Sequence, residues 1–283
     1  MSEPKVEGMR RGLAETSCGY LHYRDRGAGP PVVLLHINQQ SSALMLELMA
    51  ALAPTMRAVA FDYPSHGMSD HLAEQPSIEL YADCAVEVMD WLGIDRAAVI
   101  GEAVGAATAA SLAGRHADRI ERAVLVNCPL FVDDATAEHD IADIRDRARP
   151  ADETGFPRTR TVDFMLEHDP EHAPMDPSQS WVDRINVSQM QAGRDRWQAL
   201  GALRRFDMLD NLRKIRRPVM LLTGEHFYYG RHRPTIEAAI PEVVSKVVPH
   251  GRFCMMWERA TEIAQEALNF FGHPNESKRG GLQ

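Results

Sequence analysis

The feature that most constrains the fold is a series of short apolar runs that alternate with longer amphipathic segments along the 283-residue chain. Runs such as VVLL and AVLV contain no polar residue, as in strands that are buried on both faces of a sheet. They predict strands at 18–25, 31–36, 58–62, 97–101, 122–127, 218–222 and 245–249. Helices are expected between them, at 42–53, 77–92, 104–116 and 258–271. This alternation favours an α/β fold with a mostly parallel sheet that helices cover on both faces.

The strand pattern stops between residues 130 and 205, where charged and proline-containing sequence replaces the apolar runs. Because strands resume afterwards, this segment is predicted to be a helical insertion into one domain. Ligands of open α/β sheets bind beyond the carboxyl ends of the strands, so an insertion after the 122–127 strand would cover the pocket as a cap. The core then comprises 1–129 and 206–272, and 273–283 is expected to be a flexible tail.

Charge and cysteine content limit the partners and the compartment that we expect. The chain has 31 Lys and Arg against 40 Asp and Glu, a formal net charge of -9, which disfavours binding to nucleic acid or to an anionic membrane. The four cysteines form no CxxC pair, which in a chain of this length favours reduced thiols. The sequence shows neither a signal-peptide pattern nor an apolar run of membrane-spanning length. We therefore expect a cytoplasmic protein.

Four motifs occur in an order that is typical of one large family. A strand ends at His36, a D-x-P-x-H-G-x-S-D turn occupies 62–70, a G-E-A-V-G sequence occupies 101–105, and W-E-R occupies 257–259. Together they resemble the α/β-hydrolase superfamily, and in layout its small bacterial esterase, lipase and C–C hydrolase branches. The resemblance implies an eight-stranded, mostly parallel sheet flanked by helices, with a helical cap insertion over the pocket.

The resemblance also locates a catalytic triad, and this chain has other residue types at its positions. The sharp turn that holds the family's nucleophile carries Ala103, and a methyl group cannot attack a carbonyl. The family's acid falls at Phe227. Its base falls at Phe253, or at Arg252 if the preceding glycine is kept in register. We therefore expect a degenerate triad that forms no acyl-enzyme.

Four other side chains are candidate catalytic groups. Glu102 precedes the elbow residue and would serve as a general base if burial raised its pKa, although a scaffold role is the favoured interpretation. His36 ends a buried strand, where a structural histidine is favoured over a proton shuttle. His226 and His250 lie on loops at the pocket end of the sheet, where either is a candidate for a displaced base or a surface group. No metal site is expected, because Pro170 interrupts the histidine-containing segment 167–172.

Ligand contacts are expected from the loops at the pocket end and from the cap. The backbone N–H groups of Val104 and Asn38 stand where the family builds its oxyanion hole. Such sites combine an apolar lining with a few polar groups. The residues expected to contact a substrate are Ile37, Asn38, Gln39, Val104, Trp181 and Arg252.

Three classes of function remain open from the sequence. The first is a non-hydrolytic enzyme of lyase, isomerase, cyclase or cofactor-free oxygenase type that acts on an apolar, oxygenated, cyclic or aromatic molecule. The second is a catalytically silent binding or regulatory protein. The third is a hydrolase with relocated catalytic residues, or one inactivated by an alanine at position 103. No cofactor is expected, and a homodimer is a possible assembly.

Overall fold

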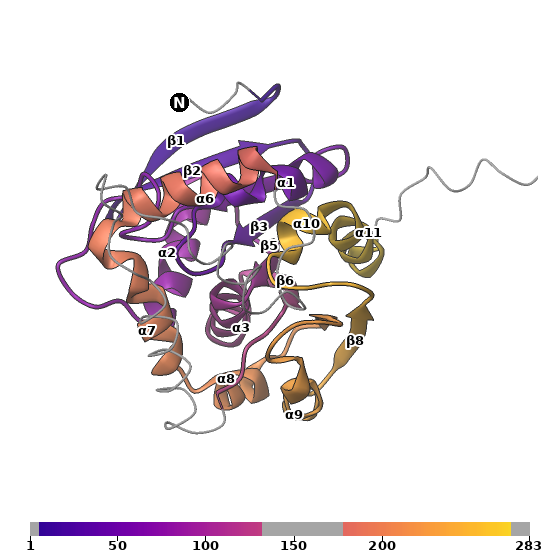
Figure 1. Ribbon diagram of the computed structural model, residues 1–283. Helices are drawn as coiled ribbons and strands as arrows, with labels where there is room; N and C mark the ends of the chain where they lie inside the picture. The colour runs from indigo at the N-terminus through magenta and orange to yellow at the C-terminus, as the bar shows by residue number, and fades with distance from the viewer. Residues whose placement is uncertain (1–5, 132–177, 273–283) are drawn as a thin grey trace, which may run out of the picture.

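A computed structural model describes residues 6–131 and 178–272, which form one eight-stranded sheet with helices on both sides (Figure 1). The strands lie in the order β1-β2-β4-β3-β5-β6-β7-β8. Their bounds are β1 Met9–Thr16, β2 Gly19–Arg26, β3 Pro31–Leu35, β4 Arg57–Phe61, β5 Ala97–Glu102, β6 Ile120–Val126, β7 Val219–Gly224 and β8 Val243–Val248. β2 is antiparallel to both of its neighbours, and all pairs from β4 to β8 are parallel. The expected mostly parallel sheet is confirmed.

Helices form a layer on each face of this sheet (Figure 1). The α-helices are α1 Leu46–Leu52, α2 Ile78–Trp91, α3 Val104–Arg115, α6 Gln179–Ala192, α7 Gln198–Arg204, α8 Met208–Lys214, α9 Arg233–Ala239, α10 Met255–Glu258 and α11 Ala260–Phe271. Short 3-10 turns are η1 Ser42–Met45, η2 Gly193–Trp197 and η3 Gly230–His232. Side chains of α2, α3, α8 and α9 share one hydrophobic cluster, and those of α1, α10 and α11 share the other.

The central strands supply both clusters by turning successive side chains to opposite faces. In β3, Val33 and Leu35 belong to the cluster of α2 and α3, whereas Val32 and Leu34 belong to the cluster of α1 and α11. A strand buried on both faces needs apolar residues at every position. This is why the runs in the sequence are unbroken rather than alternating.

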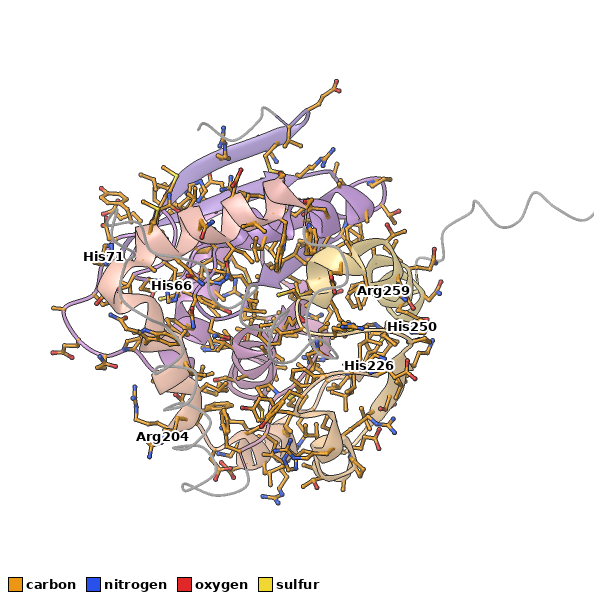
Figure 2. All side chains as sticks on the ribbon, in the orientation of Figure 1. His66, His71, Arg204, His226, His250 and Arg259 are labelled. Carbon is orange, nitrogen blue, oxygen red and sulfur yellow. The ribbon has the colours of Figure 1, made fainter. Side chains whose placement is uncertain are left out.

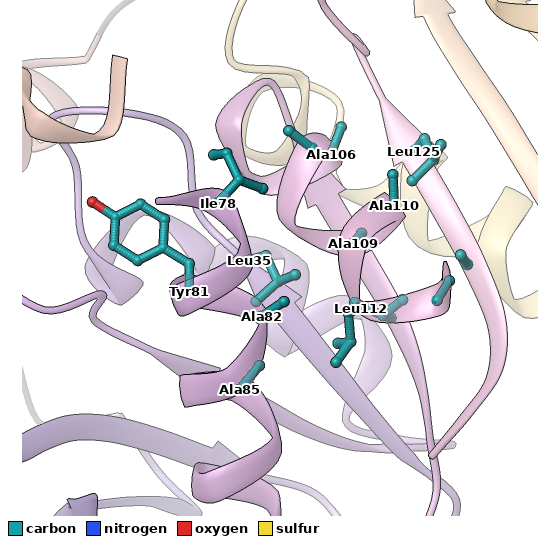
Figure 3. Close-up of a cluster of buried hydrophobic side chains, with 14 of the residues drawn as sticks. Leu35, Ile78, Tyr81, Ala82, Ala85, Ala106, Ala109, Ala110, Leu112 and Leu125 are labelled. Atoms are coloured by element: carbon teal, nitrogen blue, oxygen red, sulfur yellow. The ribbon is translucent and has the colours of Figure 1, made fainter. Parts of the chain in front are cut away.

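Helix α3 lies deep in the structure because its side chains are small. Ala106, Ala109 and Ala110 are fully buried between α2 and β6, and Ala82 and Ala85 of α2 belong to the same cluster (Figure 3). Small residues on both helices allow the backbones to approach each other closely. The helix that begins at the elbow therefore packs closely against α2 and the sheet.

Gly105→Ala is expected to lower the free energy of unfolding by about 3 kcal/mol. A Cβ at this position would lie 2.1 Å from the carbonyl oxygen of Leu35, and a backbone atom of a buried strand cannot move aside cheaply. Gly114→Ala in the same helix is the matched control, because its Cβ would meet its nearest neighbour at 3.5 Å. The control should stabilise the chain by about 0.5–1 kcal/mol, since alanine favours helix over glycine. Urea titration of both variants measures this, and equal losses would contradict the steric argument.

Strand β1 was not expected from the sequence. Its residues, MRRGLAET, include adjacent charged side chains and no apolar run. It pairs with β2 alone among the described strands and lies at the edge of the sheet. An edge strand needs only part of one face buried, so its sequence lacks the pattern that identified the central strands.

The predicted cap, 130–205, lies largely outside the described residues. The described residues at its C-terminal end form α6, η2 and α7. The division into core and cap remains a prediction, and the predicted tail, 273–283, lies outside the described residues. None of the helices that the structure describes combines the length and the apolar character needed to cross a bilayer.

Candidate functional site

The turn between β5 and α3 holds Ala103 in a conformation that non-glycine residues rarely adopt. Its φ is 52° and its ψ is -111°, outside the main allowed regions for an L-residue. The Ala103 N–H donates to the carbonyl oxygen of Val126 at 3.1 Å, and the Ala103 carbonyl accepts from the N–H groups of Ala106 and Ala107. Such strain is typical of functional turns. The structure therefore has the elbow geometry of the family, with a methyl group at its apex.

The two expected backbone donors stand at the ends of neighbouring parallel strands. Val104 is the first residue of α3, where N–H groups have no partner inside the helix. Asn38 lies in the turn that follows β3, and β3 pairs directly with β5. The next residue, Gln39, has a φ of 62°. The strand pairing brings both loops to the same edge of the sheet, and their joint use as an oxyanion hole remains a prediction.

Two phenylalanines stack at the positions that the sequence analysis predicted for the family's acid and base. The ring centroids of Phe227 and Phe253 are 6.4 Å apart, with an angle of 16° between the ring planes. Tyr229 contacts Phe227 at 5.8 Å and Phe131 at 5.4 Å, in edge-to-face geometry. These four residues form what we call the aromatic cluster. It lies beyond the carboxyl ends of β6, β7 and β8.

Backbone contacts between the loops after β7 and β8 bring the two phenylalanines together. The His226 N–H donates to the Gly251 carbonyl oxygen at 2.9 Å, and the Glu225 N–H donates to the Val248 carbonyl oxygen at 3.1 Å. A Cβ on Gly224 would lie 2.6 Å from backbone atoms of Gly251. Only glycine permits this approach.

Glu102 is fully buried and holds the start of α10. Its Oε1 accepts from the Met255 N–H and from Asn127 Nδ2, both at 2.9 Å, and its Oε2 accepts from the Met256 N–H at 3.0 Å. Burial raises the pKa of Glu102 to about 7, against the opposing effect of these hydrogen bonds. Both carboxylate oxygens are thus engaged with the scaffold, which favours the structural interpretation of this residue.

His36 is also held by the backbone. Its Nε2 accepts from the Tyr63 N–H at 3.2 Å, so Nδ1 carries the proton and donates to the Ile37 carbonyl oxygen at 2.7 Å. Burial, followed by repulsion from His66, lowers the pKa of His36 to about 3. A neutral histidine with both ring nitrogens occupied is a structural group. Ile37 is buried beside it.

His226 and His250 lie at the periphery of the molecule, close to Arg259 and on the other side of the view from His66 (Figure 2). Both face Glu225: its Oε2 is 3.8 Å from His226 Nε2 and 3.9 Å from His250 Nδ1. The structure therefore brings together two predicted candidates with a carboxylate that the sequence analysis did not single out.

Two of the expected ligand contacts lie where α6 meets the core. Trp181 is 1% exposed and stacks on Trp257 of α10, with ring centroids 4.6 Å apart. Gln39 Oε1 accepts from Gln189 Nε2 at 3.2 Å. A second polar contact joins Ser188 to the loop after β3. These side chains fasten α6 over the loop that carries Asn38.

Asn127 is a site residue that the sequence analysis missed. Its Nδ2 donates to Glu102 Oε1 at 2.9 Å and to the Arg252 carbonyl oxygen at 2.7 Å, and its Oδ1 accepts from the Gly224 N–H at 3.0 Å. It thus ties together the ends of β5, β6 and β7 and the loop after β8. The sequence feature that could have identified it is its place as a polar residue directly after the buried strand in RAVLVN.

A comparison with known families identifies the family of this chain from most of its length. Residues 30–260 match the family model described as alpha/beta hydrolase fold. This chain belongs to the α/β-hydrolase fold family. The predicted fold is confirmed by this match and by the sheet.

Named relatives and solved structures of the α/β-hydrolase family include several hydrolases. Haloalkane dehalogenase 2 of Mycobacterium tuberculosis is 34% identical over 130 residues, 44% of this chain and 44% of that protein. The 2-hydroxymuconate semialdehyde hydrolase of Pseudomonas sp. is 33% identical over 106 residues, 36% of this chain and 38% of that protein. The chain thus spans less than half the length of these relatives.

Two solved structures share the fold over nearly the whole chain. A hydrolase from Pseudomonas aeruginosa superposes with a TM-score of 0.77 at 22% identity, covering 93% of this chain and 98% of that one. The enol-lactonase from Burkholderia xenovorans superposes with a TM-score of 0.72 at 22% identity, covering 92% and 100%.

Proposed function

We propose that this α/β-hydrolase-fold protein binds an apolar, oxygenated small molecule with a cyclic or aromatic ring, and does so without a covalent intermediate at residue 103. The observation that carries the proposal is Ala103 at the apex of the elbow, with φ 52° and ψ -111°. A methyl group has no lone pair with which to attack a carbonyl carbon. The elbow geometry is retained while the nucleophile is missing.

The aromatic cluster supports both the missing triad and the class of ligand. Phe227 and Phe253, which the sequence analysis assigned to the acid and base positions, stack on each other, and neither side chain transfers a proton. Aromatic rings prefer offset or edge-to-face partners and bury a large area. An aromatic or cyclic ligand therefore suits this wall, while the Val104 and Asn38 N–H groups would hold its oxygen.

The surroundings of the elbow favour non-hydrolytic chemistry or simple binding. Glu102 and His36, the nearest candidate bases in sequence, both have their polar atoms engaged with the backbone. Backbone donors alone stabilise a carbonyl or enolate oxygen, as a lyase, isomerase, cyclase or cofactor-free oxygenase requires. Retention of a ligand without turnover is the alternative for the same pocket.

Hydrolysis by relocated residues is the second candidate, and the relatives favour it. The semialdehyde hydrolase is named for hydrolysis, and haloalkane dehalogenase 2 for the removal of a halogen. In this chain the base would then be His226 or His250. Products formed in 18O-labelled water separate the candidates: label incorporated across a cleaved ester or C–C bond supports hydrolysis, and turnover without label supports the first proposal.

A panel of aromatic ketones and phenols should raise the melting temperature of the full chain. Ligand at about 100 times its Kd stabilises the native state by about 2.7 kcal/mol. Phe253→Ala should reduce the shift in melting temperature, because it removes one ring of the aromatic cluster that would contact the ligand. Phe271→Ala, at the last residue of α11 and outside the aromatic cluster, is the matched control and should retain it. Mass spectrometry of material that co-purifies identifies the natural ligand, and a panel without any shift would overturn the proposal.

A further inference from the structure

The loops after β7 and β8 bring three metal-ligating side chains together outside the elbow. Glu225, His226 and His250 each offer one donor atom, and these atoms all lie within 4.8 Å of one another. The carboxylate is central: Glu225 Oε2 is 3.8 Å from His226 Nε2 and 3.9 Å from His250 Nδ1. We propose that these three residues form a binding site for a divalent transition metal of the Zn²⁺ class.

The donor set fits that class of ion. Imidazole is a borderline ligand, so a set of two imidazoles and one carboxylate suits Zn²⁺ better than Mg²⁺ or Ca²⁺, which prefer oxygen at every position. Bond lengths of about 2.0–2.1 Å in tetrahedral geometry place donors about 3.3 Å apart. The side chains of Glu225, His226 and His250 are 49%, 27% and 69% exposed. They can therefore turn by the roughly 1.5 Å or less that brings donors within 4.8 Å of one another to about 3.3 Å.

The backbone prepares the site before an ion binds. The His250 N–H donates to Glu225 Oε2 at 2.9 Å, which fixes the central carboxylate and lowers the pKa of Glu225. The His226 N–H is tied to Gly251, next to His250. His250 itself has a φ of 54°, a strained conformation for a residue other than glycine. The hydrogen bond to the Glu225 carboxylate is of the kind that orients ligating carboxylates in metal sites.

An ion at this site would connect the two loops that carry the aromatic cluster. Phe227 follows His226 directly, and Phe253 lies three residues after His250. Three protein ligands leave at least one coordination position for water, as in sites that exchange their ligands. The site thus acts as a clamp on the wall of the proposed pocket, and its existence does not depend on the function proposed for that pocket.

Zinc titration of the full, chelator-treated chain tests the proposal. Isothermal titration with ZnCl₂ should show one ion per chain, and the ion should raise the melting temperature because it binds the native state. His226→Ala and His250→Ala should each weaken binding tenfold or more. Glu225→Gln should do the same while keeping an acceptor for the His250 N–H, which protects the local fold. His71→Ala is the matched control: this exposed histidine pairs with Asp195 on the other side of the molecule and should not matter.

Cobalt supplies a readout that needs no variant. Cys18 and Cys84 lie with their Sγ atoms 3.3 Å apart and are the competing site for a soft ion. Co²⁺ held by imidazole and carboxylate should show weak visible bands without the intense near-ultraviolet absorption of thiolate ligation. Absence of binding, unchanged affinity in the histidine variants, or a thiolate band would each overturn the proposal.

Discussion

At pH 5, Glu102→Ala should lower the free energy of unfolding by about 3–5 kcal/mol. The substitution removes the acceptor of three N–H groups, from Met255, Met256 and Asn127, all of which are buried. Each buried donor left without a partner costs about 1–3 kcal/mol. Loss of the carboxylate also frees the first turn of α10 from β5. Urea titration measures the change, and the exposed Glu121→Ala, expected to remain within about 0.5 kcal/mol, is the matched control.

The loss of unfolding free energy caused by Glu102→Ala should become smaller as the pH rises, because an ionised carboxylate is less stable in this buried site than in water. Burial raises the pKa of Glu102 in the folded chain to about 7, from 4.5 in the unfolded chain. The stability that this raised pKa contributes to the folded chain is fully present below pH 4.5 and is lost as the pH rises through 7. The loss amounts to about 3 kcal/mol. Titrations at about pH 5, 6, 7 and 8 follow it.

Glu102→Gln isolates this effect, because an amide resembles the neutral carboxyl and does not titrate. The stability of wild type relative to this variant should fall between about pH 5 and pH 8. A pH-independent difference would show that Glu102 keeps one protonation state across this range. Burial would then not control the ionisation of this carboxyl.

The central fold could be predicted because burial on both faces leaves an unmistakable sequence pattern. The strands β3, β5 and β6 contain almost only apolar residues, and their predicted and observed bounds differ by one or two residues. β1 escaped prediction because an edge strand is stabilised by backbone pairing with β2 rather than by its own apolar residues. The apolar sequence pattern therefore identified the buried strands, and it missed the edge strand that is stabilised mainly by backbone hydrogen bonds.

The residues of the candidate site could be predicted only where they belong to a short motif with fixed spacing. Ala103 lies at the turn because Gly101 and Gly105 permit close backbone packing around it. Asn127 was missed because its role depends on hydrogen bonds to three separate chain segments. Likewise, Glu225 and His250 are 25 residues apart, and only the pairing of β7 with β8 makes them neighbours.

Ala103→Ser alone should not produce an esterase, whereas a triple variant that adds Phe227→Asp and Phe253→His should exceed it by about 10²–10⁴ in turnover of p-nitrophenyl esters. The elbow would present the new hydroxyl correctly, but serine at neutral pH is a weak nucleophile without an adjacent base. Phe253 offers no proton acceptor. The stacking of Phe227 and Phe253 places the two substituted positions side by side, as an acid–base pair requires.

The comparison between these two variants decides whether the site is dismantled or only rearranged. Members of a triad act as a unit, so one restored member recovers little beyond what binding and backbone donors provide. The single variant should therefore match wild type in steady-state turnover and show no burst of p-nitrophenol. Circular dichroism on both variants controls for folding, because Phe227→Asp and Phe253→His introduce polar side chains into an apolar cluster.

A burst from Ala103→Ser alone would mean that another base already reaches residue 103. His250→Ala and His226→Ala in that background would then identify it, and the proposal of a pocket without a working triad would be wrong.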